Sequence, residues 1–416
     1  MPRSESIVII GGGAAGFFCG IQIAEQHCKL GRAVPQITIL EANKEPLIKV
    51  KISGGGRCNV THACFDPLQL AQHYPRGNQE LKGAFHIFQP QDTISWFTQH
   101  GVALKTEADG RIFPASDDSL SIVQCLLKTA TDYGIKLYTQ AVCSQVKRHE
   151  DQRFLVTLKS GQTIICDRLV LATGSHPSGY KIARSLGHEI IAPIPSLFTF
   201  QVSDPKIHAL MGLSVGSVKI SLDPKFAKSC QSGSILFTHW GFSGPAVLKL
   251  SAWMARELHA CQYQTEFYIN WINNDNMEQV YQELRQYKLH APKRKTANST
   301  QYHLPQRLWC YLLEKSEIDL RKLWTEVGNK QLHLLAKNLT KSSYHLAGKG
   351  VFKEEFVTCG GVSLRQVNWK SMESRVCPHL YFAGEILDID GVTGGFNLQS
   401  AWTTGYIAGL AISKCS

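Results

Sequence analysis

The ten residues from Ile7 to Gly16, IVIIGGGAAG, constrain the fold of this chain more than any other stretch. Four consecutive apolar residues predict a buried strand, and the apolar-rich stretch Ala14 to Glu25 predicts a helix directly after it. Between them, Gly11, Gly13 and Gly16 have the G-x-G-x-x-G spacing. In such a turn the first glycine permits a tight bend, the second lets the backbone approach a pyrophosphate, and the third lets the helix pack on the strand.

A second apolar strand, Gln36 to Leu40, ends in Glu41. In dinucleotide-binding folds an acidic residue at this place binds the ribose hydroxyls. The pyrophosphate lies at the helix N-terminus, where free N–H groups and the helix dipole favour negative charge. The alternative is an ordinary glycine-rich turn, which leaves the second strand and its acid unexplained. We therefore predict a dinucleotide site that includes Ala14 and Ala15 as well as the three glycines and Glu41.

The composition indicates an ordinary globular protein with one unusual quantity, its charge. A chain of 416 residues is long enough for two or three domains. No apolar run approaches the length of a membrane span, and the start MPRSES is too short for a signal peptide. The 13 cysteines are scattered singly, so they predict neither disulfides nor a metal site. We therefore expect a cytoplasmic protein. The net charge of +11 indicates either solubility or a polyanionic partner such as nucleic acid, and composition does not choose between them.

Residues 49–61, KVKISGGGRCNVT, form the next distinctive segment. Its three glycines predict a loop whose backbone can lie close to a flat or charged group. Arg57 can hold a phosphate or a ring carbonyl, and Cys58 is a candidate proton donor or nucleophile. A buried structural thiol is the alternative for Cys58. We expect the loop to contact the cofactor through Lys51, Ser53, Gly54, Gly55, Gly56 and Arg57.

Blocks along the whole chain resemble one family of bacterial flavoproteins, the HI0933-like (YhiN/BaiN-like) NAD(P)/FAD-dependent oxidoreductases. They are IVIIGGGAAG, SGGGRCNVTH, DGRIFPAS at 109–116, FTHWGFSGPA at 237–246, LPQRL at 304–308, TCGGV at 358–362 and YFAGEILDIDGVTGGFNLQS at 381–400. Two residues depart from the usual family pattern: Gln306 stands where a lysine is common, and Cys359 where another small residue is common.

The resemblance implies an α/β fold, a Rossmann-like FAD-binding domain with an inserted β-barrel and a small helical subdomain. We predict that residues 1–192 and 350–416 form the FAD-binding domain. Residues 193–270 and 330–349 are then the inserted barrel, and residues 271–329 the helical subdomain.

Further cofactor-binding residues follow from this resemblance. Arg168 to Gly174, RLVLATG, predicts a strand whose turn passes near the adenine and pyrophosphate, so we assign Thr173 and Gly174 to the cofactor. We add Val142, which precedes the expected strand Cys143 to Lys147. The short strand Leu380 to Ala383 ends at Gly384 and Glu385, and Glu385 matches an acidic residue that binds the ribityl chain in many flavoproteins.

Gly394 and Gly395 open the predicted helix Leu398 to Ile412. A helix N-terminus near the flavin would stabilise the negative charge that develops on reduction. A glycine-capped surface helix is the alternative, and it does not explain why so many glycines surround two acidic residues. We include Phe396, Asn397 and Leu398 in the expected site.

After about Pro193 the pattern changes to short alternating strands, which predict a separate sheet or barrel. Helices are predicted in the same insert over Met277 to Lys288, Gln306 to Glu314 and Ile318 to Lys341. The segment Ala291 to Ser299 carries Lys293, Arg294 and Lys295 and shows no apolar anchor. We predict a mobile basic loop, either a solvated surface or a contact with phosphates.

The family resemblance also implies the chemistry. NAD(P)H reduces the FAD, and the reduced FAD in turn reduces a C=C bond that is conjugated to a carbonyl. Family branches are associated with a steroid-like substrate and with a uridine of 23S ribosomal RNA, which becomes dihydrouridine. The charge and the basic insert favour RNA. In the expected reaction Cys58 protonates the carbon α to the carbonyl, and Arg57 stabilises the enolate. The alternatives are a small-molecule ene reductase and a non-catalytic, flavin-carrying RNA-binding factor; the sequence does not indicate an oligomeric state.

Overall fold

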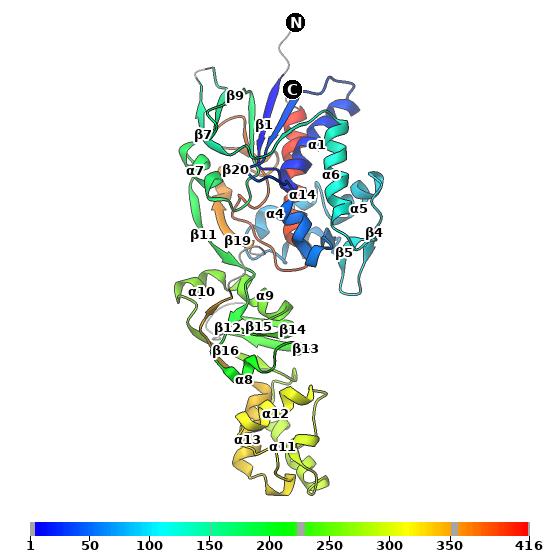
Figure 1. Cartoon of the computed structure of the whole chain (residues 1–416), viewed down its shortest axis with the longest axis vertical. Coiled ribbons are helices and arrows are strands. Elements are labelled where there is room, and N and C mark those ends of the chain that lie inside the picture. The colour runs from blue at the N-terminus through cyan, green and yellow to red at the C-terminus, as the bar shows by residue number, and fades with distance from the viewer. Residues whose placement is uncertain (1–4, 150, 223–228, 351–356, 415–416) are drawn as a thin grey trace. The chain divides into compact units, whose positions relative to one another are not determined.

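The computed structural model describes residues 5–149, 151–222, 229–350 and 357–414. The chain forms two compact units, one of Met1–Pro195 with Glu354–Ser416 and one of Ser196–Lys353 (Figure 1). The first unit is therefore built from both ends of the chain, and the second unit is inserted between them.

A seven-stranded sheet in the order β20-β21-β22-β10-β1-β2-β6 forms the centre of the first unit. The five strands from β22 to β6 run parallel, and β20 and β21 are antiparallel at one edge. The bounds are β20 Val367–Asn368, β21 Glu373–Ser374, β22 Leu380–Phe382, β10 Arg168–Leu171, β1 Ser6–Ile10, β2 Gln36–Leu40 and β6 Lys136–Tyr138. Every residue of β1 is buried, as expected for a parallel strand that is covered on both faces. The predicted α/β Rossmann-like architecture is confirmed.

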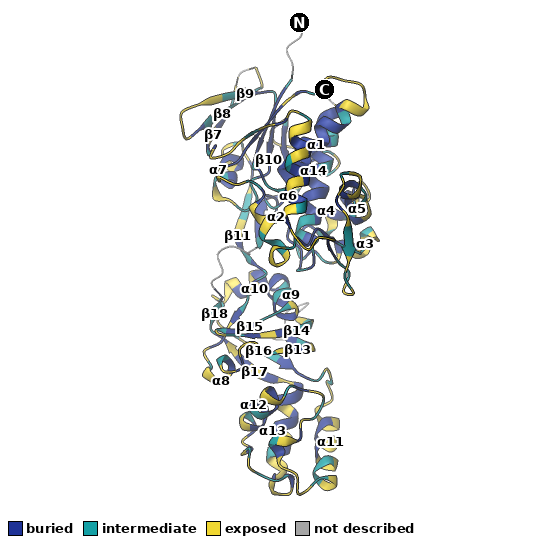
Figure 2. Ribbon diagram, turned by 45° about the vertical axis from the view of Figure 1, so that its right-hand side comes forward, coloured by how far each residue is buried: buried dark blue, intermediate teal, exposed yellow. Residues whose placement is uncertain are grey.

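Two long helices, α1 (Ala14–Lys29) and α14 (Phe396–Lys414), pack on each other beside this sheet, and Figure 2 shows both largely buried. They approach closely at two glycines of α14. A Cβ added at Gly405 would lie 2.7 Å from the carbonyl oxygen of Ala15, and one at Gly409 would lie 2.8 Å from that of Cys19. The many small residues of α14 are therefore explained by this helix contact.

The other elements of the first unit surround the sheet. The helices are α2 Ile48–Ile52, α3 Pro67–Ala71, α4 Asn78–Phe85, α5 Pro90–Gln99, α6 Leu120–Asp132 and α7 Pro177–Ser185, with the 3-10 turns η1 Ser53–Gly56 and η4 Leu364–Gln366. Three small sheets contain β3 Thr61–His62, β5 Arg111–Pro114 and β4 Leu104–Thr106; β7 Cys143–Arg148, β8 Phe154–Leu158 and β9 Thr163–Cys166; and β11 Ile190–Ser196 with β19 Val357–Val362.

The second unit contains a seven-stranded antiparallel sheet in the order β17-β16-β13-β14-β15-β12-β18. The bounds are β12 Phe200–Gln201, β13 Ser214–Ser221, β14 Cys230–Thr238, β15 Gly241–Ser243, β16 Thr265–Asn270, β17 Ser342–Leu346 and β18 Gly348–Lys349, with helices α8 Pro205–His208, α9 Pro245–Trp253 and α10 Ala255–Ala260. β17 and β18 are the two edge strands of this sheet, whereas in a closed barrel the edge strands pair with each other. The predicted barrel therefore stays a prediction.

All helices of the C-terminal half of the insert lie between β16 and β17, which pair antiparallel as a hairpin. They are α11 Met277–His290, α12 Gln306–Lys315 and α13 Asn329–Thr340, with the 3-10 turns η2 Thr296–Asn298 and η3 Trp324–Glu326. The helix predicted over Ile318 to Lys341 is wrong from Ile318 to Gly328, because α13 begins at Asn329. There the carboxylates of Asp319 and Glu326 accept hydrogen bonds from the backbone N–H groups of Arg321 and Leu323, which favours turns over a helix.

The basic segment Ala291 to Ser299 also differs from the prediction, because it has an anchor. Thr296 is fully buried, and its carbonyl oxygen accepts a hydrogen bond of 2.9 Å from Nε1 of the buried Trp309. The sequence pattern missed this anchor because Thr296 is polar and its aromatic partner lies 13 residues away.

Candidate cofactor and active site

The glycine-rich turn after β1 has the geometry that its spacing predicts. Gly11 has φ +116°, and a Cβ there would lie 2.2 Å from the carbonyl oxygen of Ala172, at the end of β10. A Cβ at Gly16 would lie 2.0 Å from the carbonyl oxygen of Gly11. A Cβ at Gly13, by contrast, would meet nothing within 4 Å. Gly11 and Gly16 therefore serve the packing of the turn, whereas Gly13 borders open space.

That open space lies at the N-terminus of α1. Gly13 is the N-cap residue, no side chain caps the helix, and its first turn, which includes Ala14 and Ala15, carries no acidic residue. Because the first N–H groups of a helix lack partners within the helix, this terminus suits a phosphate.

Glu41, at the end of β2, lies beside the same turn. Its Oε2 accepts a hydrogen bond of 2.8 Å from the N–H of Gly12, and its Oε1 accepts two from Asn43, also of 2.8 Å. The backbone N–H of Ala141 donates to the carbonyl oxygen of Glu41, which brings Val142 to this side of the sheet. The carboxylate is thus fixed, and Oε2, which accepts a single hydrogen bond, keeps a lone pair for a ribose hydroxyl.

A second polar group forms where the turn after β10 meets the turn after β22. Nζ of Lys49 lies 2.5 Å from Oε2 of Glu385 and 3.3 Å from Oγ of Ser175. Oε1 of Glu385 accepts from the N–H of Thr358. Gly174 borders the same carboxylate, with Oε2 of Glu385 3.5 Å from the position of a Cβ. Gly384, just before Glu385, packs against the Cβ of Ala15.

Two buried hydroxyl groups lie next to this group without a hydrogen-bond partner in the described part of the chain. They are Oγ1 of Thr173 and the hydroxyl of Tyr180, whose side chain is 6% exposed. Burial raises the pKa of Tyr180, and the carboxylates of Glu385 and Asp388 raise it further. Buried hydroxyls normally have hydrogen-bond partners, so these two are available to a bound group. An open helix N-terminus, a fixed acid and two partnerless hydroxyls together fit FAD.

The SGGGRC loop lies in the same unit. Gly54, Gly55 and Gly56 have φ of +59°, +69° and +85°, a conformation that favours glycine. Oγ of Ser53 donates to the carbonyl oxygen of Val50, and Lys51 forms an exposed ion pair with Glu45. Cys58 is fully buried, and this burial raises the pKa of its thiol to about 12. The thiol is therefore protonated at neutral pH and has no surface open to solvent.

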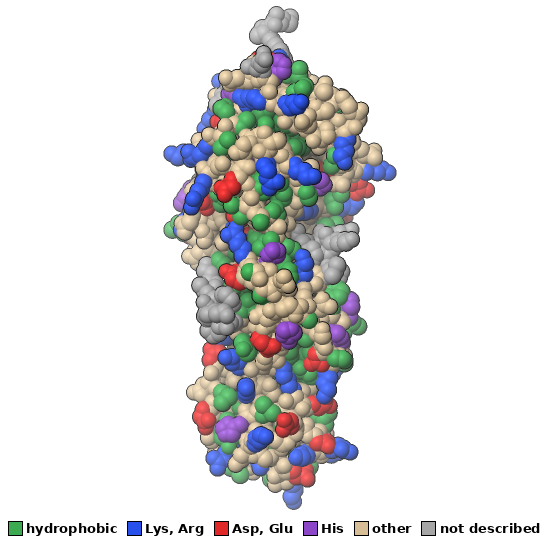
Figure 3. All heavy atoms as spheres, turned by 90° about the vertical axis from the view of Figure 1, so that its left-hand side faces the viewer, with side chains coloured by type: hydrophobic (Ala, Val, Ile, Leu, Met, Phe, Trp, Pro, Cys, Tyr) green, Lys and Arg blue, Asp and Glu red, His purple; other side chains and the backbone are tan. Residues whose placement is uncertain are grey.

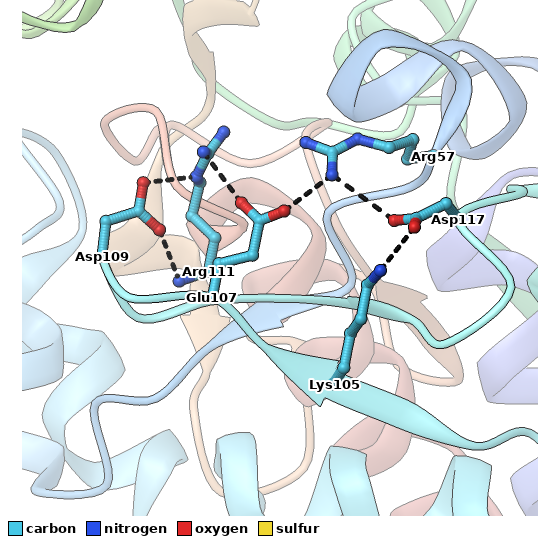
Figure 4. A network of polar contacts seen from close by, with 6 residues as sticks. All are labelled: Arg57, Lys105, Glu107, Asp109, Arg111 and Asp117. Atoms are coloured by element: carbon cyan, nitrogen blue, oxygen red, sulfur yellow. Dashed lines mark hydrogen bonds and ion pairs between the residues drawn. The ribbon is translucent and has the colours of Figure 1, made fainter.

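Arg57 belongs to a network of ion pairs, which Figure 4 shows. Its Nη1 lies 2.7 Å from Glu107 and 3.4 Å from Asp117. Glu107 also binds Arg111, which in turn pairs with Asp109, and Asp117 binds Lys105. The guanidinium of Arg57 stacks on the ring of Phe113 at 4.0 Å. The network holds Arg57 in one position and partly neutralises its charge.

The start of α14 approaches this loop through Asn59. With its amide oriented to satisfy all its neighbours, Asn59 accepts a hydrogen bond of 2.9 Å from the N–H of Gly395. The ring of Phe396 stacks on both His62 and His73, with centroid distances of 4.8 Å and 4.2 Å, and the two histidine rings lie 6.0 Å from each other.

The residues around the start of α14 make further contacts within the first unit. The side-chain amide of Asn397 forms two hydrogen bonds with the backbone of Gly391, and Leu398 is half-buried. A Cβ at Gly394 would lie 2.8 Å from the ring of Phe396. These contacts hold the N-terminus of α14 beside the SGGGRC loop.

The structure thus groups the predicted residues at two places in one unit, around the start of α1 and around the SGGGRC loop. Four residues of the site were not predicted from the sequence: Lys49, Tyr180, Asn59 and Glu107. Asn59 and Lys49 stand inside or beside a quoted motif, so their polarity was a usable signal. Tyr180 and Glu107 carried none, because their importance depends on contacts between distant segments.

Comparison with known proteins gives the family and the fold of the chain. The family model described as the HI0933-like protein Rossmann domain matches residues 5–411. This chain belongs to the HI0933-like family. The fold shared with this family is a Rossmann-like FAD-binding fold. No helix in the described ranges is both long and apolar enough to cross a membrane.

This chain is also similar over its full length to proteins with named activities. A ribosomal RNA dihydrouridine synthase of Haemophilus influenzae is 32% identical over 439 residues, covering 100% of both chains. A 3-dehydro-bile acid delta(4,6)-reductase of Clostridium scindens is 28% identical and covers 98% of this chain and 99% of its own. Among solved structures, a 3-ketosteroid-delta4-(5alpha)-dehydrogenase from Rhodococcus jostii RHA1 has a TM-score of 0.51 at 12% identity, covering 99% of this chain and 98% of its own. The chain is accordingly a flavin-dependent oxidoreductase of this family.

Proposed function

We propose that this protein reduces a uridine of 23S ribosomal RNA to dihydrouridine, using FAD and NAD(P)H. The proposal rests first on the full-length similarity to the ribosomal RNA dihydrouridine synthase of H. influenzae. It rests second on the distribution of charge along the chain.

The excess of positive charge lies almost entirely in the second unit. Residues 196–353 contain 20 Lys and Arg against 11 Asp and Glu, so they hold nine of the eleven net positive charges of the chain. The first unit, which holds the candidate cofactor site, is nearly neutral. A polyanionic substrate explains this separation, because phosphates are bound by Lys and Arg outside the place where the base reacts. A small substrate gives no reason for it.

In the proposed reaction, bound FAD supplies the hydride that is added to the C=C bond. The start of α1 and Glu41 would hold its pyrophosphate and ribose, and Thr173, Tyr180 and Glu385 would hold its middle part. Arg57, fixed by Glu107 and Asp117, would stabilise negative charge on the substrate carbonyl. Cys58 can donate a proton because its thiol stays protonated, but its full burial means that the SGGG turn must move first.

Reduction of a small steroid-like molecule is the second candidate. The bile acid reductase of C. scindens, 28% identical over nearly the whole chain, favours it. On that reading the charge of the insert serves solubility only. A flavin-carrying RNA-binding factor without turnover is the third candidate, and it predicts RNA binding without consumption of NAD(P)H.

Mass spectrometry of ribosomal RNA from cells with and without the gene tests the proposal. We expect one dihydrouridine in 23S ribosomal RNA that disappears with the gene and returns when the purified protein, NAD(P)H and unmodified RNA are combined. Unchanged ribosomal RNA, together with reduction of an unsaturated 3-ketosteroid by the purified protein, would establish the second candidate instead.

For the inserted sheet we propose closure into a barrel. Its two edge strands, β17 and β18, are separated by Ala347 alone, and the N–H of Ala347 donates to the carbonyl oxygen of Gln201 in β12. One continuous segment therefore pairs with both ends of the sheet.

A further inference from the structure

Two loops of the helical region pair with each other along their backbones. The N–H of Thr296 donates to the carbonyl oxygen of Lys322 at 2.9 Å, and the N–H of Trp324 donates to that of Arg294 at 3.0 Å. Lys295 and Leu323 face each other as an antiparallel bridge. Segments 291–299 and 319–326, which are separated by helix α12, therefore form one surface. We name it the paired-loop surface.

The inner side of the paired-loop surface is rigidly supported. Trp324 and Trp309 are fully buried beneath it, and Nζ of Lys288 in α11 donates to the carbonyl oxygen of Val327 at 2.7 Å. The surface is thus held by aromatic packing on one side and by backbone hydrogen bonds along its length. Fixed cations bind phosphates with a smaller loss of conformational entropy than cations on flexible loops.

Cationic side chains occupy the outer side of the surface. Lys293, Arg294 and Lys295 are exposed and Lys322 is half-exposed. Within the described residues, no ion pair joins any of these four to a carboxylate, whereas the neighbouring Arg321 pairs with Asp319 at 2.8 Å. Four cations without acidic partners on two adjacent backbone segments make a local concentration of positive charge.

This concentration is not a general property of the molecule. On the face drawn in Figure 3, Lys and Arg side chains are spread among Asp and Glu side chains and do not gather in one patch. In the first unit several cations are paired with acids, as in Lys105–Asp117 and Lys128–Asp132.

We propose that the paired-loop surface binds the phosphodiester backbone of RNA, with Lys322 joining Lys293, Arg294 and Lys295 as a phosphate contact. The inference rests on the proposed function for the identity of the nucleic acid. Since Trp309 and Trp324 are buried, neither of these tryptophans can stack on a base. The four cations position the RNA and do not read its sequence, because phosphate contacts carry no sequence information.

The test compares two triple variants of the flavin-loaded full chain. K293S/K295S/K322S removes three cations from the paired-loop surface. K136S/K147S/K159S removes the same charge from exposed lysines of the first unit for which no ion pair occurs in the described chain. Binding to an unmodified 23S ribosomal RNA transcript, and to a non-ribosomal RNA of equal length, is measured at several KCl concentrations. Dihydrouridine formation in the 23S transcript is measured in parallel, and thermal melting and flavin content control for folding.

We expect the first variant to lower the slope of log K against log[KCl] by about 2–3 units, one lost contact accounting for about 0.7–0.9 units. The loss should be equal for both RNAs, and the second variant should keep the wild-type slope. An equal decrease of the slope in both variants, or no decrease in either, would overturn the role of the paired-loop surface in RNA binding. If the wild type still forms dihydrouridine in that case, the proposed function remains intact. A loss confined to the first variant, without dihydrouridine formation by the wild type, would support the surface and overturn uridine reduction.

Discussion

Nζ of Lys49 lies 2.5 Å from Oε2 of Glu385, although 336 residues separate the two in the chain. The pair joins α2 to the turn after β22, and Ser175 extends it to the turn after β10. Three segments from different parts of the chain thus meet at the carboxylate assigned to the ribityl chain. The lysine chosen from the sequence was Lys51, which contacts the exposed Glu45 instead.

The variant K49M should weaken FAD retention about tenfold, or 1.4 kcal/mol, because Glu385 loses the cation that fixes and neutralises it. K51M removes the same charge from the exposed ion pair with Glu45 and should cost less. Flavin fluorescence during dilution measures both dissociation constants. Equal losses in the two variants would remove the special role of Lys49.

Gly13 and Gly16 should respond differently to the same substitution. The Cβ of G13V meets no protein atom within 4 Å, so the flavin-free chain should keep its melting temperature while FAD retention is lost. G16V forces a Cβ to within 2.0 Å of the carbonyl oxygen of Gly11 and should destabilise the fold itself. Thermal melting with and without flavin separates the two effects. Normal flavin content in G13V would show that the pyrophosphate does not lie there.

For Cys58 we expect C58A to retain FAD and its reduction by NAD(P)H but to lose substrate turnover by about 10²-fold. Since burial raises the pKa of the thiol to about 12, the wild-type rate should show no loss from thiol ionisation between pH 7 and 9. Stopped-flow measurement of the two half-reactions checks this. Wild-type turnover in C58A would make Cys58 a structural thiol.

His100 should make the stability of the protein depend on pH. Its Nε2 lies 3.0 Å from Oε1 of the buried Glu25, and its ring stacks on Trp96 at a centroid distance of 3.9 Å. Burial lowers the pKa of His100, but hydrogen bonds to Glu25 and to the carbonyl oxygen of Trp96 outweigh it and raise the pKa overall.

A histidine whose pKa is raised by folding stabilises the folded state fully at a pH below its pKa in the unfolded chain, about 6.5. This stabilisation is lost as the pH rises through its pKa in the folded protein. H100Q should therefore lower the urea midpoint more at pH 5.5 than at pH 8.5, and H149Q, at an exposed histidine beside Asp151, serves as the control. An equal decrease at both pH values would contradict the charge effect.

Local patterns predicted the first unit well. β1, the glycine turn and α1 are contiguous, and each follows from side-chain periodicity and the steric freedom of glycine. β2 with Glu41 and the helix after Gly395 were predicted for the same reason. The pairing of β1 with β2 in one sheet followed from the known strand order of such folds and from the family resemblance.

The contacts that depend on distant segments were not predictable. Whether Lys49 or Lys51 reaches Glu385 depends on the direction of a five-residue helix, which no sequence period reveals. The full burial of Cys58 depends on how several segments pack around it, which no sequence period reveals. The stretch from Ile318 to Gly328 has helical composition but forms turns, because its acidic side chains bond to its own backbone.

The position of the helical region has a consequence for how such chains vary. Because β16 and β17 are hydrogen-bonded neighbours, with Ile269 opposite Ser342, everything between them is in topological terms the tip of a hairpin. A tight turn of two residues could join the same strands without altering any strand order. The region can accordingly be shortened, exchanged or transplanted as a cassette, and related chains should differ most in length at this point while keeping the sheet that carries it.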